Sequence, residues 1–316
     1  MNMANYSGVH LRRIARWAAL LLLFAAGTAG AQRRRDYERD YRSAVDTTFS
    51  FDSRGTVSLT LGSGDIVVTS WSRDQVRVHA TSDNGGIRLD ATGSRLTVEL
   101  ADAYRGDDSR FEVTVPRGVR VIARAQSGDI SISGTQGEVD ARSQSGDIKV
   151  DNVANRIDIG TLSGDIEAHG VNGDTQIKSV SGDVQVSDFK GDFEAETVSG
   201  SIGLRNALGR YVRSHTTSGD LVYEGAIDPS GRYELSAHSG DIRLGIPSSS
   251  SAQLTISTWS GTIDSDFPIT LRPGEHGIGS GQAKRFTFEI GGGDARITAE
   301  TFSGDITIGS RGSSRN

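Results

Sequence analysis

One tetrapeptide recurs along this chain at a fixed interval, and this repeat constrains the fold more than any other feature. Ser127-Gly128-Asp129-Ile130 returns with a constant 18-residue period in four further copies, which begin at Ser145, Ser163, Ser181 and Ser199. Looser copies begin at Ser63, Ser218, Ser239, Ser260 and Ser303. Units this short bury their apolar face only against their neighbours, so the chain is expected to form a stack of equivalent coils.

Composition agrees with a β-rich stack. The 316 residues include 40 glycines, only 5 prolines and no cysteine. Ser, Thr, Val and Ile fill the segments between the glycines, and helical patterning is nearly absent after the signal-like N-terminus. Such a composition predicts an all-β protein without disulfide bonds.

Two short strands and two turns are expected in each 18-residue coil. The fourth residue of the tetrapeptide and the residue two later are apolar, as in Ile130 and Ile132, and a second alternating pair begins about nine residues on, as at Val139. This period of two is typical of a strand with one buried face. A hexapeptide β-helix would need aliphatic residues where Gln136 and Arg142 stand. The predicted fold is therefore a two-sided parallel β-solenoid whose coils lie about 4.8 Å apart.

The N-terminal segment 1–31 is expected to be a signal peptide. Three arginines precede an apolar run from Trp17 to Ala26, and Ala29-Gly30-Ala31 is a small-x-small cleavage site. The apolar run is too short to span a bilayer. We expect export, cleavage before Gln32, and a periplasmic, cell-surface or secreted product with no permanent membrane span.

Four regions are expected after the signal peptide. They are a charged linker over 32–47, an irregular antiparallel β cap over 48–126, the solenoid over 127–309 and a disordered tail over 310–316. Turn signals such as Asp83-Asn84-Gly85-Gly86 indicate hairpins in the cap. The glycine-rich stretch near 273–290 interrupts the period and is expected to be a looped-out hairpin.

A structural role is expected for the Ser-Gly-Asp corner. Glycine adopts positive φ without steric cost, and Ser or Asp can hydrogen-bond the backbone of the turn it occupies. Eight of the ten copies carry Asp, whereas the other two carry Ser201 and Thr262, which can accept the same bond but are poor calcium ligands. The aspartates expected in this turn role include Asp129, Asp147, Asp165, Asp183, Asp220, Asp241 and Asp305.

A calcium ladder is the alternative interpretation of these aligned aspartates. Stacking would bring neighbouring carboxylates to roughly 5 Å, and a shared cation would relieve their repulsion. The Gly-Gly-x-Gly-x-Asp pattern of calcium-binding β-rolls is nevertheless missing from every unit. We therefore expect no metal and no cofactor.

Catalytic motifs are absent from the sequence. It contains no Gly-x-Ser-x-Gly elbow, no phosphate-binding glycine loop, no His-Glu-x-x-His and no cysteine nucleophile. His215 and His238 fall on adjacent coils but offer too few ligands for a metal. Outward charges such as Asp140, Asp158 and Glu194 mix with positive charges without a concentrated cluster, which favours a solvated face. We expect no catalytic residue.

The residue just before each corner Ser changes character along the stack. The series runs Gln126, Gln144, Leu162, Val180, Val198, Thr217, His238, Trp259 and Phe302. If strand alternation continues up to the corner, these side chains point outward and form an apolar stripe with an aromatic end. In the alternative interpretation the chain rotates into the bend and they fill the corner from inside. The candidate binding residues are Leu162, Val180, Val198, His238, Trp259 and Phe302.

The repeats, the segment Val113-Thr114-Val115-Pro116-Arg117-Gly118-Val119 and the export signal resemble a bacterial family of exported β-strand-repeat proteins named "putative adhesin", a domain of unknown function. The resemblance spans roughly Phe49 to Ile308. It implies a β-solenoid in the cell envelope or outside the cell. Adhesion is the conjectured role, and the family has no established catalytic residues to transfer.

The sequence predicts a non-enzymatic envelope or surface interaction module whose partner is an envelope protein or a glycan. Because segment 1–31 contributes three arginines and no acid to the net charge of −6, the remaining chain carries −9, which argues against nucleic acid. Two alternatives stay open. A carbohydrate-active β-helix enzyme, a polysaccharide lyase or hydrolase, would need an acidic or basic cluster on one face. A structural or sensory periplasmic protein would dock another envelope component.

Overall fold

The computed structural model describes residues 43–83, 86–100, 109–268 and 284–310. In these ranges the secondary structure consists of strands joined by turns, and no helix occurs that could cross a membrane. The expected signal peptide, most of the expected linker and nearly all of the expected C-terminal tail lie outside the described residues.

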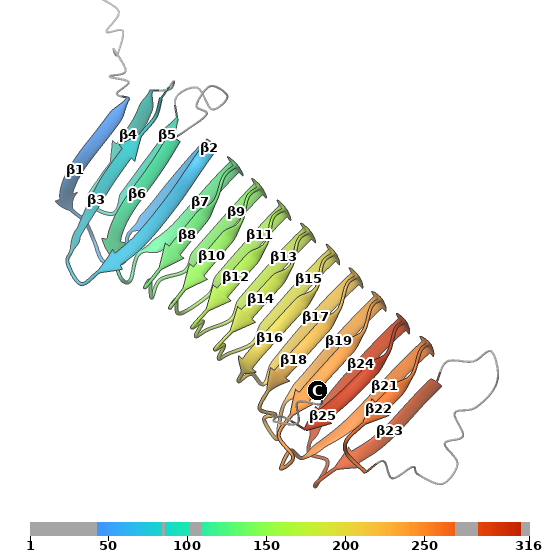
Figure 1. Cartoon of the computed structure of the whole chain (residues 1–316). Coiled ribbons are helices and arrows are strands. Elements are labelled where there is room, and N and C mark those ends of the chain that lie inside the picture. Colours follow the sequence, from blue (N-terminus) through green and yellow to red (C-terminus); the bar gives the residue numbers. More distant parts are fainter. Residues whose placement is uncertain (1–42, 84–85, 101–108, 269–283, 311–316) are drawn as a thin grey trace, which may run out of the picture. The chain divides into compact units, whose positions relative to one another are not determined.

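Successive coils pair in parallel at the register of the sequence repeat. Ile148 pairs with Ile130 on one side and with Ile166 on the other, in one sheet, and Ile159 lies between Ala141 and Ile177 in the other sheet. Each partner stands one sequence repeat away, so one repeat equals one coil. The predicted two-sided parallel β-solenoid is confirmed (Figure 1).

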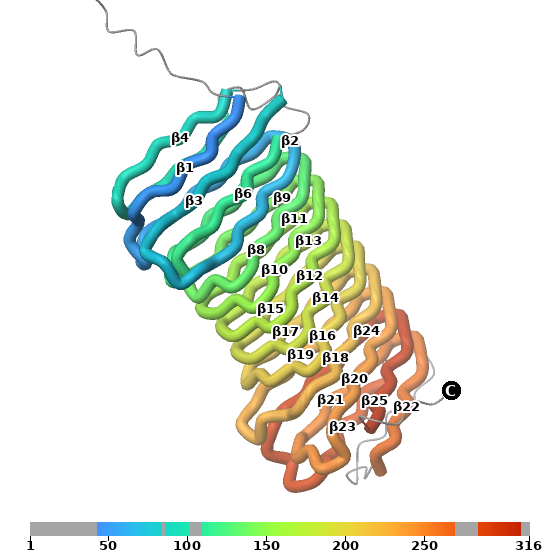
Figure 2. Tube along the Cα trace, turned by 60° about the vertical axis from the view of Figure 1, so that its left-hand side comes forward, coloured from blue at the N-terminus to red at the C-terminus, as the bar shows by residue number. Residues whose placement is uncertain are grey.

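Two sheets, here called sheet A and sheet B, form the two sides of the coils (Figure 2). In stacking order, sheet A contains β4 (Ile87–Ala91), β5 (Arg95–Leu100), the first half of β2 (Thr56–Trp71), β7 (Arg120–Ser127), β9 (Val139–Ser145), β11 (Ile157–Ser163), β13 (Thr175–Ser181), β15 (Phe193–Ser199), β17 (Tyr211–Ser218), β19 (Arg232–Ser239), β24 (Ala295–Ser303), β21 (Ala252–Ser260) and β23 (Lys284–Ile290). Sheet B contains β1 (Ala44–Ser50), β3 (Gln75–Thr81), β6 (Ser109–Pro116), the second half of β2, β8 (Ile130–Ser133), β10 (Ile148–Asp151), β12 (Ile166–His169), β14 (Val184–Ser187), β16 (Ile202–Ala207), β18 (Leu221–Gly225), β20 (Ile242–Ile246), β25 (Ile306–Ser310) and β22 (Ile263–Ser265).

The inward side chains of both sheets form a continuous apolar core. The alternation read from the repeat places Ile148 and Val150 of β10 and Ile157 and Ile159 of β11 inside, where all four are fully buried. The turn that leads from sheet B back to sheet A is filled by Val153, Val171, Phe189 and Ala207. Because each coil buries its apolar pairs against the next coil, the core runs through the stack.

The turn from sheet B to sheet A uses residues with left-handed backbone conformation. Five equivalent positions, one in each successive coil, have φ between 51° and 75°, and they are Gly134, Asn152, Gly170, Asp188 and Asn206. Asn and Asp are the non-glycine residues that tolerate this region best, because their short polar side chains bond locally. The turn chemistry therefore repeats with the same period as the core.

The parallel stack begins before residue 127. Strand β2 pairs in parallel with β5 and β7 in sheet A and with β6 and β8 in sheet B, so Ser63-Gly64-Asp65-Ile66 is a corner like the others. The antiparallel cap is present but consists of the pairings β1–β3, β3–β6 and β4–β5. β1 starts at Ala44, inside the range expected to be linker, because it pairs along its whole length with β3.

The last repeat copy lies out of sequence order in the stack. β24 and β25 lie between the coil of β19 and β20 and the coil of β21 and β22 (Figure 1). β23 then pairs antiparallel with β21. Residues 284–290 of the expected looped-out hairpin are thus a strand of sheet A, while 269–283 lie outside the described residues.

Candidate functional site

The Ser-Gly-Asp corners form a hydrogen-bonded ladder along the stack. The backbone N–H of Asp165 donates to Oδ1 of Asp147 at 2.8 Å, and that of Asp183 donates to Oδ1 of Asp165 at 2.8 Å. In stacking order the ladder joins Asp129, Asp147, Asp165, Asp183, Ser201, Asp220, Asp241, Asp305 and Thr262. The donor belongs to the next coil, not to the residue's own turn as expected, because parallel stacking brings the equivalent amide within about 5 Å.

Protonation is expected to weaken the last step of this ladder. The N–H of Thr262 donates to Oδ1 of Asp305 at 2.7 Å. Backbone and side-chain hydrogen bonds from Thr262, together with the charge of Lys284, lower the pKa of Asp305 below its ordinary value. A carboxylate with a lowered folded-state pKa contributes stability above the unfolded pKa of about 3.9 and loses it as the pH falls toward the folded value.

The measurement is thermal unfolding of wild type and Asp305→Asn between pH 7 and pH 2. The amide keeps an acceptor oxygen but does not titrate in this range. We expect wild type to melt at the higher temperature at neutral pH, with the gap closing below about pH 4. A gap that stays constant down to pH 2 would contradict this assignment.

The predicted stripe at the corner is exposed, so the interpretation of these side chains as inward corner filler is wrong. The exposed fractions are 50% for Leu162, 43% for Val180, 49% for Val198, 52% for Trp259 and 50% for Phe302. His238 is also exposed. Alternation therefore continues to the corner, and the residues one position earlier, Ser143, Thr161, Ser179, Thr197 and Thr258, are buried. We call Leu162, Val180, Val198, Thr217, His238, Phe302 and Trp259 the corner ridge.

The aromatic end of the corner ridge is a stack of rings. His238 and Phe302 have centroids 5.0 Å apart with planes at 11°, and Phe302 and Trp259 have centroids 6.0 Å apart with planes at 7°. Phe302 occupies the middle because β24 lies between β19 and β21. The faces of the Phe302 ring are therefore turned toward its two neighbours, and its edge is turned toward solvent.

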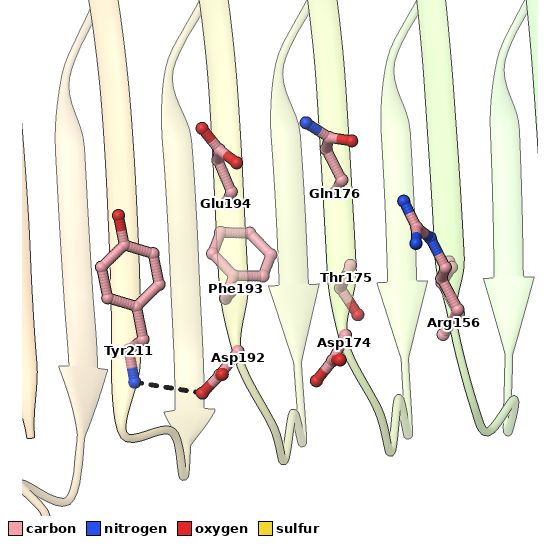
Figure 3. A pocket seen from close by; sticks show the side chains of 9 residues that line it. Arg156, Asp174, Thr175, Gln176, Asp192, Phe193, Glu194 and Tyr211 are labelled. Atoms are coloured by element: carbon pink, nitrogen blue, oxygen red, sulfur yellow. Dashed lines mark hydrogen bonds between the residues drawn. The ribbon is translucent and has the colours of Figure 1, made fainter.

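A groove of about 390 Å³ lies across the first residues of the sheet A strands (Figure 3). Its polar lining comes from Arg156, Asp174, Gln176, Asp192 and Glu194, with Tyr211 at one end. The N–H of Tyr211 donates to Oδ1 of Asp192 at 3.3 Å. Further hollows adjoin it, one sharing Arg156 and the other sharing Asp192.

Sequence reasoning named Glu194 but missed that this groove forms. Asp174 and Asp192 occupy equivalent positions of adjacent coils, at the same place in the coil where Arg156 and Tyr211 also stand. This equal spacing was the available signal, because parallel coils bring equivalent positions side by side. The structure thus gathers three carboxylates on sheet A, where the sequence analysis expected only mixed charges.

One exposed cluster has the residue types of a catalytic triad without its geometry. His169 Nδ1 lies 3.0 Å from Ser187 Oγ and 3.2 Å from Asp188 Oδ2. Both contacts use the same ring nitrogen, whereas a triad needs the serine and the acid on opposite nitrogens. This cluster is therefore not arranged for proton relay.

Metal-ligating side chains do not gather in the part of the chain that the structure describes. No group of three or more His, Cys, Asp or Glu residues is placed there to hold a metal ion. His215 pairs with Ser236 on the next coil, so its strand position differs from that of His238, which lies two residues nearer the corner. The ladder aspartates instead have backbone N–H groups as partners.

Comparison with known proteins identifies a family. A model described as Toastrack DUF4097 matches residues 58–309, which include the whole parallel stack from β5 to β24 and most of β2 and β25. No curated protein matches the chain.

Two solved structures are similar to this chain at low identity. One is described as a "putative cell adhesion protein" from Clostridium sporogenes, with 9% identity and a TM-score of 0.23, covering 85% of this chain and 100% of that one. The other is described as a "putative adhesin" from Bacteroides fragilis, with 8% identity and a TM-score of 0.39, covering 84% and 97%. Likeness at this level says nothing of what the chain binds.

Proposed function

This chain belongs to the Toastrack DUF4097 family, and from that premise we propose that it is an exported, non-enzymatic interaction module that binds a partner along its corner ridge. One observation carries the proposal. Among the described residues six large hydrophobic side chains are exposed, and five of them lie in the corner ridge, while the sixth is Leu208. A contiguous exposed apolar patch on an otherwise polar surface is typical of a binding site.

The energetics of the ridge favour binding. A large apolar side chain contributes about 1.5–3 kcal/mol when it is moved from full exposure to full burial, and these side chains still have about half of that gain available. The backbone beneath them is held by the corner ladder, with an N–H···O bond at each step. A surface that is already ordered loses little conformational entropy when a partner docks.

The ring geometry favours a protein partner over a glycan at the aromatic end. Sugars stack on the open faces of aromatic rings, and the faces of Phe302 are turned toward His238 and Trp259. The exposed ring edges and the aliphatic side chains of Leu162, Val180 and Val198 suit packing against protein side chains. The docking of another envelope component, one of the alternatives left open by the sequence, is consistent with the same surface.

A second candidate function is glycan binding in the sheet A groove. Its observation is the set of planar polar groups, Arg156, Gln176, Asp192 and Glu194, beside the half-exposed ring of Tyr211. Such groups form paired hydrogen bonds with sugar hydroxyls. The carbohydrate-active alternative places its acid and base here too, because glycoside hydrolysis uses two carboxylates on either side of the scissile bond.

Two variants of the chain from Gln32 onward show whether the corner ridge or the sheet A groove binds the partner. Trp259→Ala removes a ridge side chain, and Tyr211→Ala removes the groove's aromatic wall. Because Trp259 is 52% exposed, its loss should change the free energy of unfolding by no more than about 1 kcal/mol. We expect Trp259→Ala to abolish capture of a partner from envelope extract and Tyr211→Ala to leave it unchanged.

A glycan array and an assay for hydrolysis of the bound glycan are run on the same proteins. Glycan binding that is lost only in Tyr211→Ala would show that the binding site is the groove and not the ridge. Hydrolysis that is lost in Asp192→Asn would establish the enzymatic alternative. A large drop in melting temperature for Trp259→Ala would show that this side chain is structural.

A further inference from the structure

We propose that the aliphatic half of the corner ridge, Leu162, Val180 and Val198, binds a basic amphipathic helix of a partner protein. This inference rests on the proposed function of the ridge and specifies the chemistry of its partner. It depends on the charge beside the ridge and on the spacing of the coils.

A row of carboxylates follows the aliphatic half of the ridge. Asp165 and Asp183 stand at the corners of Leu162 and Val180, and Asp147 stands at the corner one coil earlier, whereas the corner of Val198 carries Ser201. All three aspartates are exposed. Their Oδ1 atoms accept the ladder hydrogen bonds. No ion pair joins any of these three carboxylates to the rest of the described chain, whereas most outward acids of sheet A have an arginine partner. Their negative charge is therefore available to a partner.

The aromatic half of the ridge has a different charge environment. Arg243 lies 3.6 Å from Asp220 and 3.5 Å from Asp241, and Lys284 Nζ donates to the carbonyl of Gly261 at 2.8 Å. Among the ladder carboxylates beside the ridge, Asp165 and Asp183 thus have no ion pair, whereas Asp220, Asp241 and Asp305 of the aromatic half each have a cationic side chain nearby. A second copy of this chain or an anionic lipid surface would bring like charges against Asp165 and Asp183, which is repulsive. Apolar side chains flanked by unpaired carboxylates fit a segment that carries both apolar residues and Lys or Arg.

Spacing selects a helix as the form of that segment. The ridge presents one side chain per coil, about every 4.8 Å along the stack. A helix lying along the stack presents one apolar side chain per turn, about every 5.4 Å. The mismatch between helix turns and coils accumulates to only about 1.2 Å over the three aliphatic coils. Outward-facing residues of an extended strand are about 6.6 Å apart, so a strand would match the spacing of the coils, about 4.8 Å, less well. A short helix therefore matches Leu162, Val180 and Val198 in turn.

Binding of designed peptides to the chain from Gln32 onward tests this inference. The first probe is a helix-forming peptide of four turns with one leucine stripe and lysines beside it. The second replaces each lysine by glutamate, and the third has the first peptide's composition in scrambled order. We expect the lysine peptide alone to bind, to gain helical circular dichroism when it binds, and to bind more weakly as salt screens the charges.

Three protein variants locate the contact. Val180→Gln should reduce affinity about tenfold by removing the central apolar contact. The triple variant Asp147→Asn, Asp165→Asn and Asp183→Asn removes the charge and keeps the acceptor oxygens of the ladder, and it should also reduce affinity about tenfold at low salt. The matched control Asp174→Asn, Asp192→Asn and Glu194→Gln removes the same charge from the groove and should change affinity less than twofold.

Several outcomes overturn the proposal. Equal binding of the lysine and glutamate peptides, equal affinity for the two triple variants, or tighter binding to anionic vesicles than to the lysine peptide would each do so. The proposed function is tested separately. If Trp259→Ala or Val180→Gln loses the envelope partner while the Asn triple variant retains it, the ridge binds a partner but that partner is not basic.

Discussion

Replacing Gly182 by alanine is expected to destabilise the centre of the stack by about 4 kcal/mol or more. Gly182 has φ 134°, and a Cβ added there would lie 2.0 Å from the carbonyl oxygen of Gly164 on the preceding coil and 3.1 Å from Asp165 Oδ1. Neither backbone can move away, because the corner ladder ties the coils together at this point. In a solenoid such a fault separates the stack into two less cooperative halves.

Urea unfolding followed by circular dichroism measures this effect, and Gly93→Ala is the control. A Cβ added at Gly93 would meet no atom within 4 Å. The control should therefore unfold within about 0.5 kcal/mol of wild type. A Gly182→Ala variant that unfolds at the wild-type urea concentration would show that the corners do not stack as closely as described.

Replacing Phe193 by alanine is the second change with a large expected effect, about 3–5 kcal/mol. Phe193 is 1% exposed and packs edge to face against Phe189, with ring centroids 5.2 Å apart. These two rings fill the coil where neighbouring coils carry smaller side chains such as Thr175. Truncation leaves a cavity between sheets that hydrogen bonds hold in place, so the walls cannot collapse to fill it.

The same substitution at Phe302 is the matched control for Phe193→Ala. Phe302 is 50% exposed on the corner ridge, so its loss should cost no more than about 1 kcal/mol. The destabilisation of the two variants is compared by measuring their denaturant midpoints under the same conditions. If Phe302→Ala were as destabilising as Phe193→Ala, the ridge would serve the fold and not a partner.

Much of the fold could be predicted because a strict repeat turns local pattern into tertiary pairing. The sequence period between Ile130 and Ile148 is also their pairing register. The alternation of Thr161 and Leu162 correctly indicated which side chain faces outward, although both orientations at the bend were open from the sequence. The reason is that side chains alternate between the two faces of a strand, so a residue's face follows once its neighbours are known to face the core or the solvent.

Other features could not be predicted from the sequence because they depend on which coils are adjacent in the stack. The place of Phe302 between His238 and Trp259 follows from the position of β24 between β19 and β21, which no local pattern indicates. The parallel pairing of β2 with β7 likewise joins segments separated by the inserted strands β3 to β6. Such long-range pairings are selected by packing over the whole stack, and the local residues are compatible with more than one order.

By itself the sequence determined the kind of coil, its length, its buried side chains and its glycine corners, because these depend only on backbone geometry and on strand alternation within a longer fixed repeat. Only the tertiary structure decided the order of the terminal coils, the donor of each ladder hydrogen bond and the meeting of Asp174, Asp192 and Glu194 in one groove. These are contacts between coils. Their partners are chosen by proximity after stacking, and proximity is a property of the assembled sheets.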